Sequence, residues 1–331
     1  MIKVAINGFG RIGRTAFKKL FENKNIEVVA INDLTAPSTL AHLLKYDSVH
    51  GRFNGKVEST ETAITINGKT IPVYAERDPS KLPWAKHDVD VVVESTGFFT
   101  KAEAAEAHIK AGAKKVIISA PATGNLKSIV LGINDDILDG SEKIISNVSC
   151  TTNNAVPMIK ILNDNWGIEN ANISTIHAYT GDQSLHDAPH KDLRRARAAA
   201  NSIIPTTTGA AKAVIDIFPE MEGRLEGSSL RVPVISGSIT EITCILKKDT
   251  DVKSINAAFK KAAETTLKGI LEYTEDPIVS VDIIGNTHSC IFDSLLTSVV
   301  GKMAKVSGWY DNEMGYSSRI AELVAKVGQQ L

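Results

Sequence analysis

A glycine-rich turn between a predicted strand and a predicted helix is the feature that most constrains the fold. Gly8, Gly10 and Gly13 fit the pattern G-x-G-x-x-G, directly after a β-branched run at 3–7 and directly before a helical segment at 11–21. The first glycine permits a tight turn, the second lets a pyrophosphate approach the backbone, and the third allows close contact between helix and strand. The turn therefore predicts a β-α-β unit that binds a dinucleotide with its phosphates at the helix N-terminus.

The segments that follow keep alternating between the two periodicities. Strands are predicted at 26–31, 90–94, 115–119 and 143–147, and helices at 37–46 and 100–111. Thr100 and Glu103 are expected to form a capping box at the start of the second helix, and Gly112 to end it. Asn67 and Gly68 lie between two alternating runs and predict a hairpin at the rim. Such alternation is typical of a mainly parallel sheet, so residues 1–149 are expected to form a Rossmann-type domain.

The acidic residue expected at the end of the second strand is present as Asp33. A carboxylate there accepts a hydrogen bond from a ribose 2′-hydroxyl and repels a 2′-phosphate, which favours NAD. Arg77 and Ser119 lie after strands or in rim loops where a cofactor is within reach. Each of these two is equally well explained as a turn or cap residue.

Cys150 lies where a buried strand runs into the start of a helix. The unpaired N–H groups at a helix N-terminus favour a thiolate, so its pKa is predicted to be lowered. His177 follows in a strand-like segment at 173–177 and is the candidate base. A thiolate that adds to an aldehyde gives a hemithioacetal, and loss of a hydride leaves a thioester. The alternative is a small buried thiol with a structural histidine.

Hydroxyls and N–H groups near helix starts indicate phosphate binding. Thr208 and Gly209 precede a predicted helix at 210–217, and Ser149 and Thr151 flank the candidate nucleophile. Such positions make ready anion sites, and Arg231, at the head of a strand, is a charge-assisted partner for a second phosphate. Each threonine alone is explained equally well as an N-cap.

After Cys150 the pattern changes to longer alternating strands, as at 231–246, with a helix at 252–267 following Asp251. This favours a mainly antiparallel sheet with helices on one side. The predicted fold class is α/β, with an α+β catalytic domain at 150–314 after the Rossmann-type domain. A C-terminal helix within 315–331 is expected to dock back on the first domain. The long polar stretch at 179–202 is expected to be irregular.

Composition excludes several classes of function. The 331 residues are 43% hydrophobic with a formal net charge of -1, and this near-neutral charge gives no reason to expect nucleic-acid binding. No residue is assigned to a metal site. No apolar run approaches the ~18 residues of a membrane span, and no basic and apolar leader opens the chain. Three scattered cysteines argue for a reducing compartment. We therefore expect a cytoplasmic protein with no membrane partner.

Long ordered motifs across the whole chain resemble phosphorylating glyceraldehyde-3-phosphate dehydrogenase. They are the stretch 6–14, Ser149-Cys150-Thr151-Thr152-Asn153, His177-Ala178-Tyr179-Thr180, the stretch 205–212, Arg231-Val232-Pro233 and the stretch 309–317. The resemblance implies oxidation of D-glyceraldehyde 3-phosphate with NAD and inorganic phosphate to 1,3-bisphosphoglycerate, reversibly, in glycolysis.

The same resemblance implies roles for individual residues. Cys150 is the implied nucleophile and His177 the implied base. The implied substrate-phosphate residues are Thr180 and Arg231, and those at the attacking phosphate are Ser149, Thr151, Thr208 and Gly209. The implied cofactor residues are Arg11, Ile12, Asp33, Arg77 and Ser119, with Asn312 holding the nicotinamide amide. A homotetramer is also implied, with the stretch 179–202 near a neighbouring subunit's cofactor.

Three departures from the family pattern keep alternatives open. Asn154 stands where many members carry a second cysteine, the segment 234–238 differs from the usual one, and Ala188 is familiar from members that also accept NADP. Erythrose-4-phosphate dehydrogenase, which shares the scaffold but releases its thioester to water, is one alternative. A catalytically silent NAD-binding or surface protein is another, although its signature, loss of the nucleophile or base, is missing.

Overall fold

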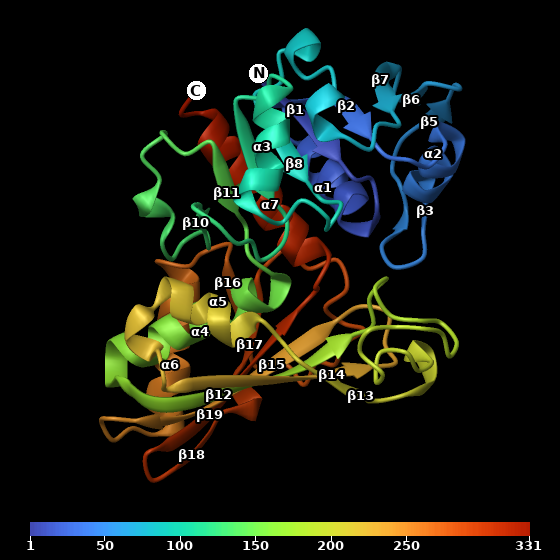
Figure 1. Cartoon of the computed structure of the whole chain (residues 1–331). Coiled ribbons are helices and arrows are strands. Elements are labelled where there is room, and N and C mark those ends of the chain that lie inside the picture. The colour runs from blue at the N-terminus through green and yellow to red at the C-terminus, as the bar shows by residue number, and fades with distance from the viewer. The chain divides into compact units, whose positions relative to one another are not determined.

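Two units make up the chain, and the computed structural model describes both over residues 1–331. Unit 1 comprises Met1–Ile129, Asp135–Val148 and Ser317–Leu331, and unit 2 comprises Val130–Asn134 and Ser149–Tyr316. Each unit is built on its own large β-sheet (Figure 1).

Unit 1 holds a nine-stranded sheet in the order β10-β11-β9-β8-β1-β2-β7-β6-β5. All pairs from β10 to β7 are parallel, and β7, β6 and β5 pair antiparallel at one edge. The strands are β1 (Ile2–Asn7), β2 (Ile26–Asn32), β5 (Val57–Ser59), β6 (Ala63–Ile66), β7 (Lys69–Tyr74), β8 (Val91–Glu94), β9 (Lys115–Ile118), β10 (Lys127–Ser128) and β11 (Ile144–Ser146), with a separate pair of β3 (Tyr46–Asp47) and β4 (Gly51–Arg52). This parallel sheet confirms the predicted Rossmann-type fold.

Helices cover this sheet. They are α1 (Arg11–Glu22), α2 (Pro37–Lys45) and α3 (Ala102–Lys110), with short 3-10 turns η1 (Pro79–Lys81), η2 (Ala85–His87) and η3 (Asp135–Ile137). α7 (Met314–Gly328) contributes its residues from Ser317 onward. Every residue of β8 and β9 is buried, as expected of parallel strands with both faces covered. Trp84 and Ala105 pack with Val92 and Val116 in the core.

Local turn chemistry agrees with the sequence at one site and differs at another. Asn67 and Gly68 both have positive φ, 50° and 84°, which gives the predicted hairpin between β6 and β7. The predicted capping box is wrong, because α3 begins at Ala102 and its N-cap Lys101 makes no side-chain cap. The N–H of Ala102 instead donates to the carbonyl of Thr123, 2.9 Å away. A backbone hydrogen bond from the neighbouring segment at Thr123 therefore takes the place of the predicted side-chain cap.

Unit 2 holds an eight-stranded, mainly antiparallel sheet, as predicted. Its order is β13-β14-β12-β15-β19-β17-β16, with β18 paired to β19. The strands are β12 (Ile168–Ala178), β13 (Ile204–Thr206), β14 (Leu225–Val232), β15 (Ser238–Leu246), β16 (Leu271–Thr274), β17 (Cys290–Asp293), β18 (Ser298–Val300) and β19 (Met303–Tyr310). α4 (Cys150–Trp166), α5 (Ala210–Ile217) and α6 (Val252–Glu264) lie on one face of it, and η4 (Ala199–Asn201), η5 (Pro219–Met221) and η6 (Ser294–Leu296) are short turns (Figure 1).

The single strand predicted at 231–246 is wrong, because the structure divides it into β14 and β15. Pro233 lacks an N–H for the sheet, and Gly237 adopts a left-handed φ of 90°. A side chain at Gly237 would meet the carbonyl oxygen of Ser280 at 2.2 Å. The predicted helix after Asp251 is confirmed as α6, but it ends at Glu264. None of the helices of the chain is long and apolar enough to span a membrane.

We predict that Gly13→Ala destabilises unit 1 by about 2 kcal/mol or more, because overpacking against rigid backbone cannot relax cheaply. A Cβ at Gly13 would lie 2.0 Å from the carbonyl oxygen of Gly8, whereas one at Gly10 would meet nothing within 4 Å. Urea unfolding of the two variants, without cofactor, measures the difference. Equal stability of Gly13→Ala and Gly10→Ala contradicts the predicted contact.

Candidate active site and dinucleotide pocket

Cys150 is the first residue of α4, at the sharp turn that follows β11, as the sequence predicts. Ser149 caps the helix, because its Oγ accepts the N–H of Thr152 at 3.1 Å. Val148 has a left-handed φ of 49°, an outlier for a β-branched residue. Such backbone strain costs about 1–3 kcal/mol and is found mostly at functional sites. The strained backbone at Val148 and the cap at Ser149 thus fix where the thiol of Cys150 lies.

His177 meets that thiol from the end of β12. Its Nε2 lies 3.4 Å from the Sγ of Cys150, so the structure brings the predicted nucleophile and base together. The ring of Tyr310 packs edge-on against the imidazole, with the ring centroids 5.9 Å apart. Arg231 pairs with His177 across β12 and β14. Neighbouring strands of one rigid sheet therefore deliver both His177 and Arg231.

The Nδ1 atom of His177 has two neighbours with opposite demands. The carbonyl oxygen of Ala178 is 2.7 Å away and needs a donor, whereas the Nη1 of Arg231 is 2.9 Å away and needs an acceptor. Arg231 Nη1 has other acceptors, at 3.1 Å on Ala178 and 3.0 Å on Thr180. When Nδ1 donates to Ala178, the lone pair of Nε2 faces the sulfur. That tautomer is the one that accepts a thiol proton.

The electrostatics of the pair differ from the sequence prediction. Burial raises the pKa of the Cys150 thiol, and the charge of Arg231 and hydrogen bonds from Thr151 oppose it only in part. Burial and then the charge of Arg231 lower the pKa of His177 to about 3. The predicted lowering of the thiol pKa is therefore wrong, because desolvation outweighs the helix N-terminus. At neutral pH a neutral thiol therefore faces a neutral imidazole.

The other two cysteines are unsuited to this chemistry. Cys244 and Cys290 are buried in strands β15 and β17. Burial raises the pKa of Cys244 to about 12 and raises that of Cys290 as well. Asn154 fills the position of a second cysteine near Cys150, and its Nδ2 donates to three carbonyl oxygens of unit 2, 3.2 to 3.3 Å away. Cys150 is the one thiol that is not fully buried.

Basic and hydroxyl groups beside the pair form a candidate anion site. Arg231 Nη1 donates to Thr180, whose hydroxyl in turn donates to Asp182. Asp182 also binds Arg195 at 2.6 Å, so its carboxylate is bonded directly to one guanidinium group and is linked to that of Arg231 only through the Thr180 hydroxyl. The Nε of Arg231 is buried and has no partner within the chain. A guanidinium group with an unused donor is suited to bind an anion.

The remaining candidate phosphate residues have local partners. The Thr151 hydroxyl lies 2.9 Å from the hydroxyl of Tyr310, and the Oγ1 of Thr208 accepts the N–H of Ala210 at 3.2 Å. Gly209 is the N-cap of α5 and offers no side-chain cap. Ser149 uses its hydroxyl as a cap. The sequence analysis gave no role to Asp182, two residues after Thr180, or to Tyr310, which lies inside the motif at 309–317.

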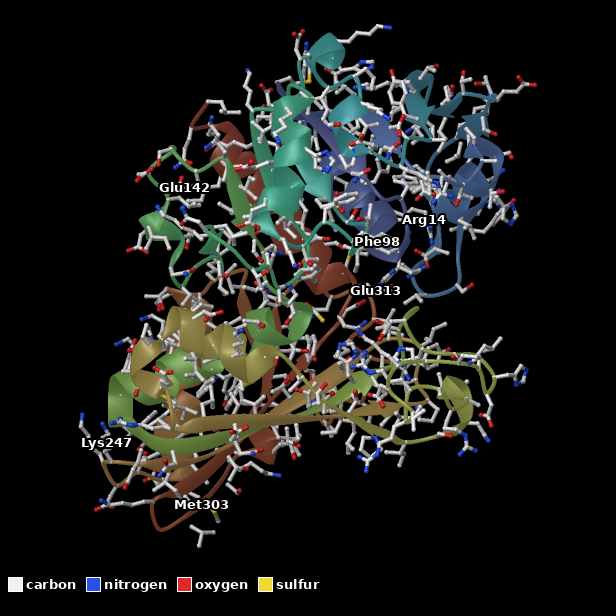
Figure 2. All side chains as sticks on the ribbon, viewed as in Figure 1. Arg14, Phe98, Glu142, Lys247, Met303 and Glu313 are labelled. Carbon is white, nitrogen blue, oxygen red and sulfur yellow. The ribbon has the colours of Figure 1, made fainter.

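Unit 1 carries a cavity of about 540 Å³ at the C-terminal edge of its sheet. Its lining contains Gly8, Gly10, Asp33 and Arg77 from the predicted cofactor residues. Exposed Phe98, on the loop after β8, also lines it, and the buried Arg14 supports the glycine turn by donating to the carbonyl of Phe9 at 2.8 Å (Figure 2). A pocket of this size at strand ends is typical of a nucleotide site.

The glycine turn fits a dinucleotide. Gly8 has a left-handed φ of 91°, and a Cβ there would meet the N of Thr96 at 2.7 Å. A Cβ at Gly10 would point into open space, which leaves room for a pyrophosphate. Asp33 accepts the N–H of Phe9 at 2.8 Å and that of Thr35 at 2.9 Å, so its carboxylate is fixed beside the turn.

Four of the predicted cofactor residues in unit 1 do not line the cavity. Arg11 binds Asp47 at 2.7 Å, and the N–H of Ser119 donates to the carbonyl of Glu94 at 2.9 Å. Gly13 packs against Gly8, and Ile12 is half-buried in α1. The cofactor contacts of these four residues remain predictions.

Asn312 belongs to unit 2, and its amide is oriented by Ser238. Its Oδ1 accepts from Ser238 at 3.0 Å, which leaves the NH₂ group to donate elsewhere. The single hydroxyl proton of the neighbouring Ser236 has a nearer acceptor in Asp311, 3.0 Å away. Ser238 also accepts the N–H of Ala178 at 3.0 Å. One hydroxyl therefore ties the end of the His177 strand to Asn312.

Comparisons with known proteins cover nearly the whole chain. Residues 2–102 match the model described as glyceraldehyde 3-phosphate dehydrogenase, NAD binding domain, and residues 149–312 match the C-terminal domain of the same enzyme. Curated proteins named glyceraldehyde-3-phosphate dehydrogenase are similar over their full length. That of Clostridium acetobutylicum is 54% identical over 98% of both chains. That of Mycobacterium avium is 55% identical, over 100% of this chain and 99% of its own. That of Borreliella burgdorferi is 56% identical, over 98% and 99%.

We predict that Arg231→Gln moves the pH dependence of Cys150 alkylation to higher pH, because the guanidinium charge lowers the thiol pKa. Iodoacetamide rates between pH 6 and 10 or thereabouts, followed by mass spectrometry of the Cys150 peptide, measure the shift. Arg197→Gln is the matched control, since Arg197 binds exposed Asp187 at 3.1 Å. An unchanged profile in Arg231→Gln contradicts the electrostatic role.

Proposed function

We propose, starting from the fact that this chain belongs to the glyceraldehyde-3-phosphate dehydrogenase family, that Cys150 carries the reaction as a thioester. The enzyme oxidises D-glyceraldehyde 3-phosphate with NAD and inorganic phosphate to 1,3-bisphosphoglycerate, a step of glycolysis. Cys150 lies at the start of α4, and the observation that supports its role most directly is the 3.4 Å contact of its Sγ with Nε2 of His177.

Cys150 and His177 supply the side chains for the first steps. The sulfur of Cys150 bonds to the aldehyde carbon as His177 passes the thiol proton to the carbonyl oxygen, which becomes the hydroxyl of a hemithioacetal. His177 then takes that hydroxyl proton through Nε2 as the C–H bond breaks and its electron pair leaves as hydride. The oxygen re-forms a carbonyl, and a thioester remains on Cys150. A neutral imidazole is the state this step requires, in keeping with the lowered pKa of His177.

NAD, when bound, accepts the hydride. Gly8 and Gly10 would hold its pyrophosphate at the start of α1, where Gly13 allows the close contact of helix and strand, and Asp33 would accept from the ribose. Arg11, Ile12, Arg77 and Ser119 complete the adenosine and phosphate contacts, and Asn312 donates its free NH₂ group to the nicotinamide amide. The cavity and the fixed carboxylate of Asp33 support this assignment.

Two phosphates are bound beside the thioester. Arg231 and Thr180 hold the phosphate of the substrate, in keeping with the unpartnered Nε of Arg231. Ser149, Thr151, Thr208 and Gly209 hold the inorganic phosphate, whose oxygen bonds to the acyl carbon as the C–S bond breaks. His177 returns a proton to the departing sulfur, which restores the thiol.

The assembly is a homotetramer in the cytoplasm, and the stretch 179–202 lies near a neighbouring subunit's cofactor. Support comes from the irregular course of this stretch, which contains only η4. Two of its three arginines are paired within the chain, Arg195 with Asp182 and Arg197 with Asp187.

We predict that NADH formation from glyceraldehyde 3-phosphate depends on inorganic phosphate beyond the first turnover, because the thioester needs an attacking oxygen. Absorbance of NADH with and without phosphate, at equal ionic strength, measures this. A steady-state rate indifferent to phosphate would identify the hydrolytic erythrose-4-phosphate dehydrogenase type instead.

We also predict that Asp33→Ala lowers kcat/KM for NAD by about tenfold and raises that for NADP, because the carboxylate accepts from a ribose hydroxyl and repels a 2′-phosphate. Steady-state kinetics with both cofactors measure the ratio. Glu61→Ala, an exposed carboxylate of the same unit, is the control. Unchanged selectivity in Asp33→Ala removes this residue from its role.

A further inference from the structure

A row of buried polar side chains crosses the sheet of unit 1 at the cofactor cavity, and two of its members, Asn7 and Asn32, help to line that cavity. Asn32, Asn7 and Glu94 are the last residues of the neighbouring strands β2, β1 and β8, and they lie side by side in register. Their exposed fractions are 5%, 1% and 2%. Buried polar groups are costly unless they are paired, so this row needs an explanation.

The hydrogen bonds of the row all run in one direction, toward Glu94. Asn32 Nδ2 donates to Asn7 Oδ1 at 2.6 Å, and Asn7 Nδ2 donates to Glu94 Oε2 at 2.5 Å. At the far end, Asn32 binds both the N–H and the carbonyl of Glu76, each at 2.9 Å. The carboxylate of Glu94 can only accept, so it fixes which way the side-chain amide of Asn7 is turned, and Asn7 in turn fixes the amide of Asn32.

Glu94 also receives donors from its other side. Its Oε1 accepts the N–H of Thr96 at 2.8 Å and the hydroxyl of the same residue. Trp84 Nε1 lies 3.0 Å from Nδ1 of His108 and can only donate, so the ring proton of His108 is on Nε2. That Nε2 donates to Glu94 Oε2 at 2.9 Å. A carboxylate that accepts all of these bonds is the acceptor on which the row converges.

The three members of the row, and Glu76 that binds Asn32 at its far end, are each followed directly by residues that line the cavity. Gly8 follows Asn7, Asp33 follows Asn32, Arg77 follows Glu76, and Ser95 with Thr96 follows Glu94. These four segments come from four different strands. Backbone pairing holds the strands, whereas the row of side chains sets the positions at which the loops leave them.

We propose that Glu94 is a positioning residue that holds the four cofactor-binding segments in the arrangement that NAD requires. The proposal rests on the proposed function, because it concerns affinity for the cofactor of that reaction. Glu94 acts through Asn7, Asn32 and Thr96 rather than by touching the reacting atoms. Segments already ordered by the row lose less conformational entropy on binding, which favours tight association.

Glu94→Gln tests this directly. Glutamine keeps the shape but places an NH₂ group against donors, so at least one bond of the row is lost. Titration of NAD by calorimetry on the full chain, well below the melting temperature, is expected to show a Kd about tenfold or more above that of the wild type. We expect kcat at saturating NAD and KM for glyceraldehyde 3-phosphate to change less than about threefold.

A second substitution reverses the polarity of the row. In the double variant Asn7→Asp with Glu94→Gln, the new aspartate accepts from glutamine and from Asn32. His108 Nε2, which lies 3.4 Å from Asn7 Nδ2, is close enough to donate to that aspartate as well. We expect the double variant to bind NAD at least about threefold more tightly than Glu94→Gln alone. A loss of packing alone would give no such recovery.

Trp84→Phe is the control for stability without positioning. It removes the bond to His108 and core volume, but leaves Asn7, Asn32 and Thr96 on Glu94, so the melting temperature falls while the Kd for NAD stays within about twofold. If Glu94→Gln proves too unstable to titrate, Glu94→Asp keeps the charge on a shorter side chain and is expected to raise the Kd at least about threefold.

The proposal is overturned if Glu94→Gln, or Glu94→Asp in its place, binds NAD within about twofold of the wild type. It is also overturned if Trp84→Phe weakens NAD as much as Glu94→Gln does. Failure of the proposed function is a separate result, because it shows as absent NADH formation by the wild type with substrate and phosphate, and the NAD titration requires no turnover.

Discussion

The contact between the sulfur of Cys150 and Nε2 of His177 is the interaction on which the chemistry of this protein depends. It exists because two elements far apart in the sequence end at one point: α4 begins at Cys150, and β12 ends just after His177. The strained Val148 fixes the first, and a sheet with Arg231 in the next strand fixes the second. The 3.4 Å separation is therefore set by rigid backbone on both sides.

Burial and charge oppose each other at this contact. Desolvation raises the pKa of the thiol and lowers that of the imidazole, so the resting pair carries no charge. Arg231 favours the thiolate and disfavours the imidazolium, and it also lies where the substrate phosphate binds in the proposed function. The site holds its groups ready for proton transfer without separating charge in advance, and the neighbouring guanidinium stabilises the anion as it forms.

The sequence predicted what depends on local pattern. The glycine turn, the Asn67-Gly68 hairpin, the parallel sheet of unit 1 and the position of Cys150 at a helix start all follow from spacing within a few residues. The predictions from sequence were wrong where a segment far away in the sequence bonds to or packs against the predicted element. Thr123 replaces the expected cap of α3, and Ser280 packs against the bend at Gly237 that interrupts a predicted strand. The thiol pKa was wrong because burial depends on tertiary packing, and the Glu94 row is visible only once strand order is known.

The most direct test of the central claim is detection of the acyl group on Cys150. The enzyme, with NAD and glyceraldehyde 3-phosphate but no inorganic phosphate, is quenched in acid, digested and measured by mass spectrometry. The account predicts one 3-phosphoglyceroyl group on the Cys150 peptide, which disappears when phosphate is added before the quench. NADH formation with no adduct, or with the adduct on another residue, would contradict it.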